Sequence, residues 1–160
     1  MLLVSSCLLG QNVKYSGGSN YCQLLAKYDD SGLLLPVCPE CLGQLLVPRP
    51  PAEIEGGTGR DVLAGGARVY SKDGSDVTAN FISGAEAVLK LAQQAGVKYA
   101  ILKARSPSCG AGKVYNGSFD GTLINGDGVT TALLKQYGIT VYTELDLTAE
   151  LLEKLLGNEG

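Results

Sequence analysis

The chain contains no histidine, and this absence excludes several kinds of active site. Without an imidazole, neither a serine–histidine–aspartate triad nor a cysteine–histidine dyad can form. Zinc sites that use histidine nitrogen as a ligand are excluded for the same reason. Metal binding in this chain would therefore rely mainly on its five cysteines and its carboxylates.

An excess of positive charge is also missing. The chain has 13 Lys and Arg against 16 Asp and Glu, which gives a formal net charge of -3. Such a chain lacks the basic field that holds duplex nucleic acid through its phosphates. Duplex nucleic acid is therefore not an expected partner, although a few local cations could still hold one phosphate.

The chain has no long hydrophobic run. The N-terminal run of residues 2–4 is too short for a signal peptide and follows no basic region, and no segment is long enough for a membrane span. We therefore expect a cytoplasmic protein with no membrane partner. In a reducing cytoplasm, five cysteines are more consistent with metal binding, catalysis or burial than with disulfides.

The residues that are present predict one globular α/β domain over residues 1–160. Short apolar runs predict buried strands at residues 2–6, 33–37, 98–103 and 139–144. Helical patterns lie at residues 20–28, 79–95, 129–137 and from Thr148 onward. This alternation predicts a Rossmann-like, mainly parallel sheet with helices on both faces.

Residues 39–74 interrupt the alternation of strands and helices. The segment holds Pro48, Pro50 and Pro51 together with seven of the 22 glycines. We expect a long ordered Pro/Gly-rich loop with a small hairpin around residues 67–72. Loops of this length in compact domains are usually functional or disordered, and the neighbouring Cys38 favours a functional lid.

Three cysteines follow predicted strands. Cys7 and Cys38 come directly after the first two strands, and Cys109 follows the third after a short segment. The carboxyl ends of parallel strands meet at one edge of a sheet, where such sheets bind ligands. If the three strands are neighbours, their sulfurs lie at a common edge, as a soft metal centre requires.

The spacing of the cysteines leaves three interpretations open. Cys7, Cys38, Cys41 and Cys109 could form a closed zinc site of four thiolates. Three of them could hold an iron-sulfur cluster that leaves one iron open. They could also simply be buried, and Cys22, on the apolar face of the first predicted helix, is expected to be a core residue.

A thioredoxin-like redox role for the CxxC of Cys38 and Cys41 is disfavoured. A redox CxxC normally opens a helix, whereas this motif is expected to lead into the proline-rich loop.

Small polar residues and glycines gather at residues 5–6, 15–20, 106–112 and 125–130, where two predicted helix N-termini could receive an anion. A closed zinc site has little use for so many small polar groups around it.

Taken in order, a set of short motifs resembles the DUF523 family, whose characterised members are thiouracil desulfidases. The motifs are Ser6-Cys7-Leu8-Leu9-Gly10, Tyr15-Ser16-Gly17-Gly18, Pro36-Val37-Cys38-Pro39-Glu40, Pro48-Arg49-Pro50-Pro51-Ala52-Glu53, Ser106-Pro107-Ser108-Cys109-Gly110 and Tyr115-Asn116-Gly117-Ser118-Phe119. The resemblance extends to about Glu144. It implies an α/β domain with a [4Fe-4S] cluster on Cys7, Cys38 and Cys109. Cys41 stands where an aliphatic residue is expected, and this departure leaves room for a fourth thiolate.

The resemblance also implies an activity. The expected enzyme removes sulfur from a thiolated pyrimidine, thiouracil or its nucleotide, by hydrolysis to uracil and sulfide without a redox change. With histidine missing, Glu40 is the candidate acid/base. Ser106 and Ser108 are candidates to orient the water or the pyrimidine, while Lys103, Arg49 and Arg105 could meet a phosphate.

A second hypothesis keeps the same cysteines without catalysis. In it, the chain is a zinc- or cluster-stabilised module that senses a metal or thiols. Aerobic preparation is expected to leave the cysteine site of either protein empty or filled with zinc, so residue types alone do not separate the two.

Overall fold

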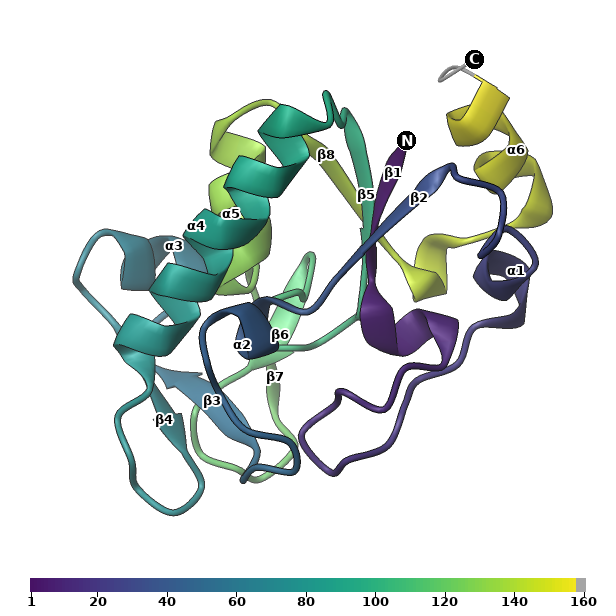
Figure 1. The fold of residues 1–160 in the computed structure, drawn as a ribbon. Coiled ribbons are helices and arrows are strands. Elements are labelled where there is room, and N and C mark those ends of the chain that lie inside the picture. Colours follow the sequence, from purple (N-terminus) through teal and green to yellow (C-terminus); the bar gives the residue numbers. More distant parts are fainter. Residues whose placement is uncertain (158–160) are drawn as a thin grey trace.

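A four-stranded parallel sheet forms the centre of the protein, seen in a computed structural model that describes residues 1–157 (Figure 1). Residues 158–160 of the predicted domain lie outside the described part. The strand order is β2-β1-β5-β8, and all three pairings are parallel. These strands are β1 (Leu2–Ser5), β2 (Leu34–Val37), β5 (Tyr99–Leu102) and β8 (Thr140–Thr143). Each falls within a predicted strand, and the α/β fold is confirmed.

Helices α4 (Thr78–Gln94) and α5 (Val129–Gln136) cover one face of this sheet (Figure 1). Leu3, Ala100 and Leu102 project to that face and join a buried apolar cluster with residues of both helices. Both helices lie within one residue of their predicted bounds. Alternate strand residues point to opposite faces, so a strand that is apolar throughout has to be covered on both sides.

The opposite face is covered by the short helix α1 (Gln23–Ala26) and by α6 (Ala149–Gly157). Leu2, Val4 and Ile101 form a second apolar cluster there with residues of these helices. Helix α6 begins after Thr148, whose Oγ1 accepts from the N–H of Leu151 at 3.0 Å, as the predicted N-cap requires. The first predicted helix is much shorter than expected, since only four residues of the predicted range 20–28 are α-helical.

The prediction of a long loop over residues 39–74 is wrong. The segment folds into α2 (Pro39–Leu42), β3 (Ala52–Glu55), α3 (Gly59–Leu63) and β4 (Arg68–Ser71). Strand β4 lies in the predicted hairpin, but its partner is β3, and α3 stands between the two. Ile54 and Val69 are buried with Phe81 in a third apolar cluster. The central strands are similarly short but lie in continuous, mostly apolar runs, whereas each of these elements contains at least one charged residue, which is why the sequence does not reveal them.

The CxxC motif also differs from its expectation, because a helical turn begins directly after Cys38. Pro39 is the first residue of α2, a position that suits its fixed φ. The turn ends at Gly43, where an added Cβ would lie 2.1 Å from the carbonyl oxygen of Asn80 in α4. Close packing of α2 on α4 therefore decides both the presence and the length of this turn.

Two further strands, β6 (Lys113–Tyr115) and β7 (Leu123–Asn125), form an antiparallel pair that the sequence analysis did not predict. Their connecting loop, residues 116–122, lies near β3 (Figure 1). Within residues 1–157, none of the helices has the length and apolar character needed to cross a membrane.

Candidate functional site

Cys7, Cys38 and Cys109 lie at the carboxyl edge of three neighbouring strands. Cys7 is in the 3-10 turn η1 (Ser6–Leu9) that follows β1, and Cys38 directly follows β2. Cys109 lies beyond β5, at the end of residues 103–108. All three line one cavity of about 810 Å³. The expectation that parallel pairing would bring these residues to one edge is confirmed.

Hydrogen bonds to Ser106 fix the turn that presents Cys109. The Oγ of Ser106 accepts from the backbone N–H groups of Ser108 and Cys109, each at 3.1 Å. On the other side, the hydroxyl of Thr131 in α5 donates to the carbonyl oxygen of Cys109 at 2.8 Å. Gly110 must remain without a side chain, because a Cβ there would lie 2.7 Å from the carbonyl oxygen of Lys113. The turn is thus held from both of its ends.

The three thiols lie in a poorly solvated environment. Burial raises the pKa of Cys38 and of Cys109 to about 12, and it raises the pKa of Cys7 as well. Charge on Glu40 adds to the effect at Cys109, whereas a hydrogen bond with Asn20 and the charge of Lys103 oppose it at Cys7. In the metal-free protein these groups are neutral thiols, and a cationic metal centre would have to displace their protons.

Cys41 occupies a different position from the other three. It does not belong to the described lining of the large cavity, but shares a smaller cavity of about 290 Å³ with Cys38. Among residues 1–157, no three Cys, Asp or Glu side chains gather closely enough to hold a single metal ion. Cys22 packs against the second apolar cluster as expected, but it is half-buried and lies at the N-cap of α1 rather than on the face of a helix.

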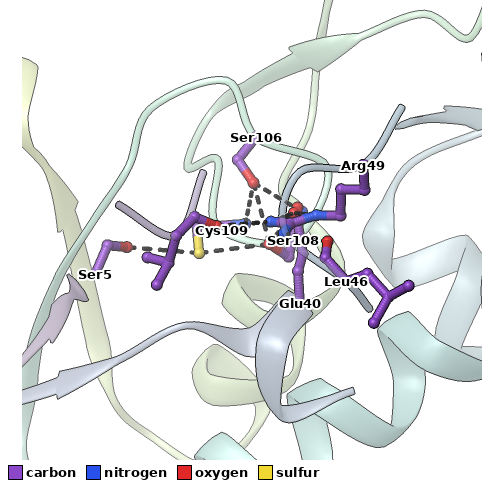
Figure 2. A network of polar contacts seen from close by, with 8 residues as sticks. Ser5, Glu40, Leu46, Arg49, Ser106, Ser108 and Cys109 are labelled. Carbon is purple, nitrogen blue, oxygen red and sulfur yellow. Dashed lines mark hydrogen bonds and ion pairs between the residues drawn. The ribbon is translucent and has the colours of Figure 1, made fainter. Parts of the chain in front are cut away.

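Glu40 and Arg49 form a buried ion pair beside Cys109 (Figure 2). The Nε of Arg49 donates to Oε2 of Glu40 at 3.0 Å, and its Nη2 contacts the same oxygen. The other carboxylate oxygen, Oε1, accepts from the Ser108 hydroxyl at 3.4 Å. Ser108 Oγ in turn lies 3.5 Å from the Cys109 sulfur and 3.0 Å from Ser106 Oγ. The predicted residues Glu40, Ser106 and Ser108 therefore form one polar network against a predicted ligand.

Two of the three candidate phosphate ligands already have partners. Arg49 also donates to the carbonyl oxygens of Val13 and Leu46, each at 3.1 Å, and its side chain is 8% exposed. Lys103 Nζ lies 3.0 Å from Oε2 of Glu144. Arg105 is exposed and lines the cavity. Arg105 is thus the candidate whose charge is best placed to meet a ligand.

The helix N-termini do not provide the expected anion sites. Helix α1 has four residues, too few for a useful dipole. At α5, the N–H of Val129 donates to the Pro107 carbonyl oxygen and that of Thr130 to the Ser108 carbonyl oxygen, each at 2.8 Å. These donors instead position the chain around Cys109.

Ser5 lines the large cavity and Glu144 contacts two residues that line it, Lys103 and Ala104, and neither Ser5 nor Glu144 was predicted as a site residue. Ser5 Oγ donates to the Cys109 sulfur at 3.6 Å and accepts from the Lys103 N–H at 2.9 Å. Oε1 of Glu144 accepts from the N–H of Ala104 at 2.7 Å. A signal existed in the sequence, since Ser5 ends β1 and Glu144 directly follows β8, at the edge where the cysteines lie.

The chain is similar to known proteins over almost its whole length. The model of a family described as 2-thiouracil desulfurase matches residues 2–146. A Bacillus subtilis (strain 168) protein, named "Uncharacterized protein YbbK", is 46% identical over 147 residues, which cover 92% of this chain and 97% of that protein. The solved structure of a protein named "[4Fe-4S]-dependent thiouracil desulfidase TudS (DUF523Vcz)" superposes with a TM-score of 0.83 at 44% identity and covers 96% of each chain.

Proposed function

Because the chain belongs to the 2-thiouracil desulfurase family, we propose that it is a [4Fe-4S]-dependent enzyme that hydrolyses a thiolated pyrimidine to uracil and sulfide. The proposal rests on one observation. Three adjacent parallel strands place Cys7, Cys38 and Cys109 at the same cavity. The similar protein of known structure, which is named as a [4Fe-4S]-dependent thiouracil desulfidase, supports the same cofactor and substrate class. The proposed cluster ligands are Cys7, Cys38 and Cys109.

The chemistry of the donor set suits an iron-sulfur cluster. Clusters are held by cysteine thiolates, and each thiolate binds a different iron, so the sulfurs need not surround one point. A closed zinc site needs four ligands around one ion. Cys41, the candidate for the fourth ligand, lines the neighbouring small cavity rather than the large one. With Cys7, Cys38 and Cys109 as its ligands, a [4Fe-4S] cluster would have one iron without a protein ligand.

When bound, the cluster supplies a Lewis acid that can hold and polarise the exocyclic sulfur of the substrate. Glu40 is the proposed acid/base. Arg49 holds its Oε2, so the lone pairs of Oε1 remain for a proton from the attacking water. Ser108, which bridges Oε1 and the Cys109 sulfur, orients that water. Glu40 then returns the proton to a ring nitrogen. The C–S bond breaks as the added hydroxyl becomes the carbonyl, and the sulfur leaves as hydrosulfide with the second proton of the water, so there is no net redox change.

Ser106 has an indirect role in this proposal. Its hydroxyl lies 3.0 Å from that of Ser108 and caps the backbone of the Cys109 turn. It thereby fixes the orientation of Ser108.

We also place the reaction in the cytoplasm, because the five cysteines are free thiols and a cluster with an open iron requires a reducing compartment.

Anaerobic reconstitution tests the proposal directly. The protein should take up iron and sulfide, become brown, and release sulfide and uracil from 2-thiouracil or 4-thiouracil. A protein that binds zinc through the same cysteines, takes up no iron, and releases no sulfide from either compound is instead the metal-binding module of the second hypothesis. Quantifying iron, zinc and sulfide in one anaerobic preparation separates the two.

A further inference from the structure

Three non-glycine residues of the described chain have a left-handed backbone, and all three line the large cavity. They are Gln44 with φ 69°, Arg105 with φ 67° and Phe119 with φ 54°. L-residues avoid this region because Cβ approaches the backbone, and bulky side chains avoid it most. Such strain persists where surrounding structure imposes it and gathers at functional sites. Gln44, Arg105 and Phe119 thus border one cavity with their backbone in an unfavourable conformation.

Glu53 imposes the conformation of Phe119. From β3, its Oε1 accepts the backbone N–H groups of Gly117 at 3.0 Å and of Phe119 at 3.1 Å. Gly117 lies so close to β3 that a Cβ would be 2.6 Å from the carbonyl oxygen of Ile54. The Oδ1 of Asn116 adds a turn by accepting the N–H of Ser118 at 2.9 Å. The loop between β6 and β7 is therefore fixed to β3 at the position of the strained residue.

Packing of the protein interior does not explain the ring of Phe119. The residue is half-buried, yet among the described residues it belongs to none of the three apolar clusters. Phe81, the other phenylalanine, is buried at the centre of the third cluster. A strained aromatic residue that leaves the core and borders the cavity is arranged for a ligand rather than for stability.

We infer that Phe119 is a specificity-determining residue whose ring stacks on the pyrimidine of the substrate, and that Glu53 is its positioning residue. The inference rests on the proposed function, since a thiolated pyrimidine is flat and offers a π-face. Stacking on an aromatic side chain tolerates any base and is independent of the position of the sulfur. Phe119 accordingly sets the preference for a planar ring, while the cysteine edge acts on the sulfur.

The kinetic test compares Phe119→Leu with the wild type, both reconstituted with iron and sulfide. With 2-thiouracil, Phe119→Leu should raise KM by about 5- to 100-fold, the range expected for loss of one stacking contact. Its kcat and iron content should stay within about twofold of the wild-type values, because stacking contributes equally to the binding of the substrate and of the transition state. Tyr137→Leu, an exposed aromatic at the end of α5, is the matched control and should leave KM unchanged.

Glu53 is tested by rescue. Glu53→Ala should raise KM as Phe119→Leu does, whereas Glu53→Gln keeps an oxygen that accepts both N–H groups and should restore most of the affinity. Phe119→Gly adds a structural readout, since glycine tolerates a positive φ. It should raise KM without lowering the Tm, and a Tm lowered by several degrees would show that the ring serves packing instead.

Different outcomes separate the inference from the proposed function. No release of sulfide by the wild type contradicts the function, and equilibrium dialysis of labelled 2-thiouracil against the cluster-loaded protein then tests Phe119 by binding alone. Equal KM or equal binding in Phe119→Leu and the wild type overturns the inference. So does a KM raised by Tyr115→Leu alone, because Tyr115 borders the same cavity with an ordinary backbone.

Discussion

Arg49 donates from Nε to Oε2 of Glu40 at 3.0 Å, and this pair joins the proposed catalytic carboxylate to the loop that follows α2. Both side chains are largely buried, with 8% of Arg49 and 16% of Glu40 exposed. Figure 2 shows the pair beside Ser108 and Cys109. Since Arg49 also holds two backbone carbonyl oxygens, the same guanidinium orders the loop and orients the carboxylate.

Arg49→Met should destabilise the protein, because it leaves the Glu40 carboxylate buried without its partner. Loss of one member of a buried pair costs on the order of 3 kcal/mol. The free energy of unfolding, measured with urea on the cluster-free protein, should fall by about this amount. The double variant Glu40→Gln with Arg49→Met should recover part of the loss, and additive effects would contradict a direct coupling.

Glu40→Gln should reduce kcat while the cluster remains bound. An amide of the same shape still accepts a hydrogen bond from Ser108 but takes no proton from water. A general acid/base contributes about 10²- to 10⁴-fold, so kcat for sulfide release should fall by that factor. Iron content is the control. Unchanged kcat would assign Glu40 a purely structural role with Arg49.

Substitution of each proposed ligand should abolish the cluster. Cys7→Ser, Cys38→Ser and Cys109→Ser replace a thiolate by a hydroxyl, which is a poor ligand for the iron of a cluster. After anaerobic reconstitution, these variants should lose the brown absorbance. Cys22→Ser is the matched control, because Cys22 packs in the second apolar cluster, and it should keep the absorbance. Full absorbance in all three ligand variants would contradict the ligand assignment.

Cys41→Ala should retain iron and activity. Although it lies close to Cys38 along the chain, Cys41 lines the smaller cavity and not the large one, so we expect that it would not be a ligand of the cluster. Iron per protein and the rate of sulfide release are the measurements. Loss of the metal, with zinc in place of iron in the wild type, would support the four-thiolate site instead.

The cluster-free protein should lose stability as the pH rises above about 9. The pKa of Cys109 is raised by burial from 9.0 to about 12, so between these values the unfolded chain releases a proton that the folded protein keeps. The thiol therefore contributes stability below pH 9 that disappears as the pH approaches 12. Each such thiol lowers the free energy of unfolding by about 1.4 kcal/mol per pH unit in this window.

Comparison with Cys109→Ala isolates this effect from the titration of lysines and tyrosines. Between about pH 8 and about pH 10, the wild type should lose about 1.4 kcal/mol more than the variant in urea unfolding. Parallel pH profiles for the two proteins would show that the thiol is not protected from ionisation in the folded state.

The central sheet was predictable from the sequence because its strands lie in continuous, mostly apolar runs. A strand such as Leu2–Ser5, in which every residue is buried, is apolar at three of its four positions, and this pattern is visible along the chain. The common edge of Cys7, Cys38 and Cys109 followed from parallel pairing once the three strands proved to be neighbours. The motifs that carry the family resemblance lie at that same edge.

Contacts between distant residues were not predictable in the same way. The helical turn at Pro39 depends on Gly43 and Gly84 at the contact between α2 and α4, where no side chain fits. The β3–β4 pair depends on the packing of Ile54 and Val69 against Phe81. None of these partners is marked by a local pattern, since each interaction joins segments that are well separated along the chain.

The sequence by itself determined which side chains are available for chemistry, namely cysteine but no histidine. It also determined the strands that carry these cysteines, because composition and local periodicity are properties of neighbouring residues. Only the tertiary structure decided that Arg49 holds Glu40, that Cys41 lies outside the large cavity and that Glu53 holds Phe119 in a left-handed conformation. These relationships depend on distance and burial between segments far apart in sequence, and such quantities exist only once the chain has folded.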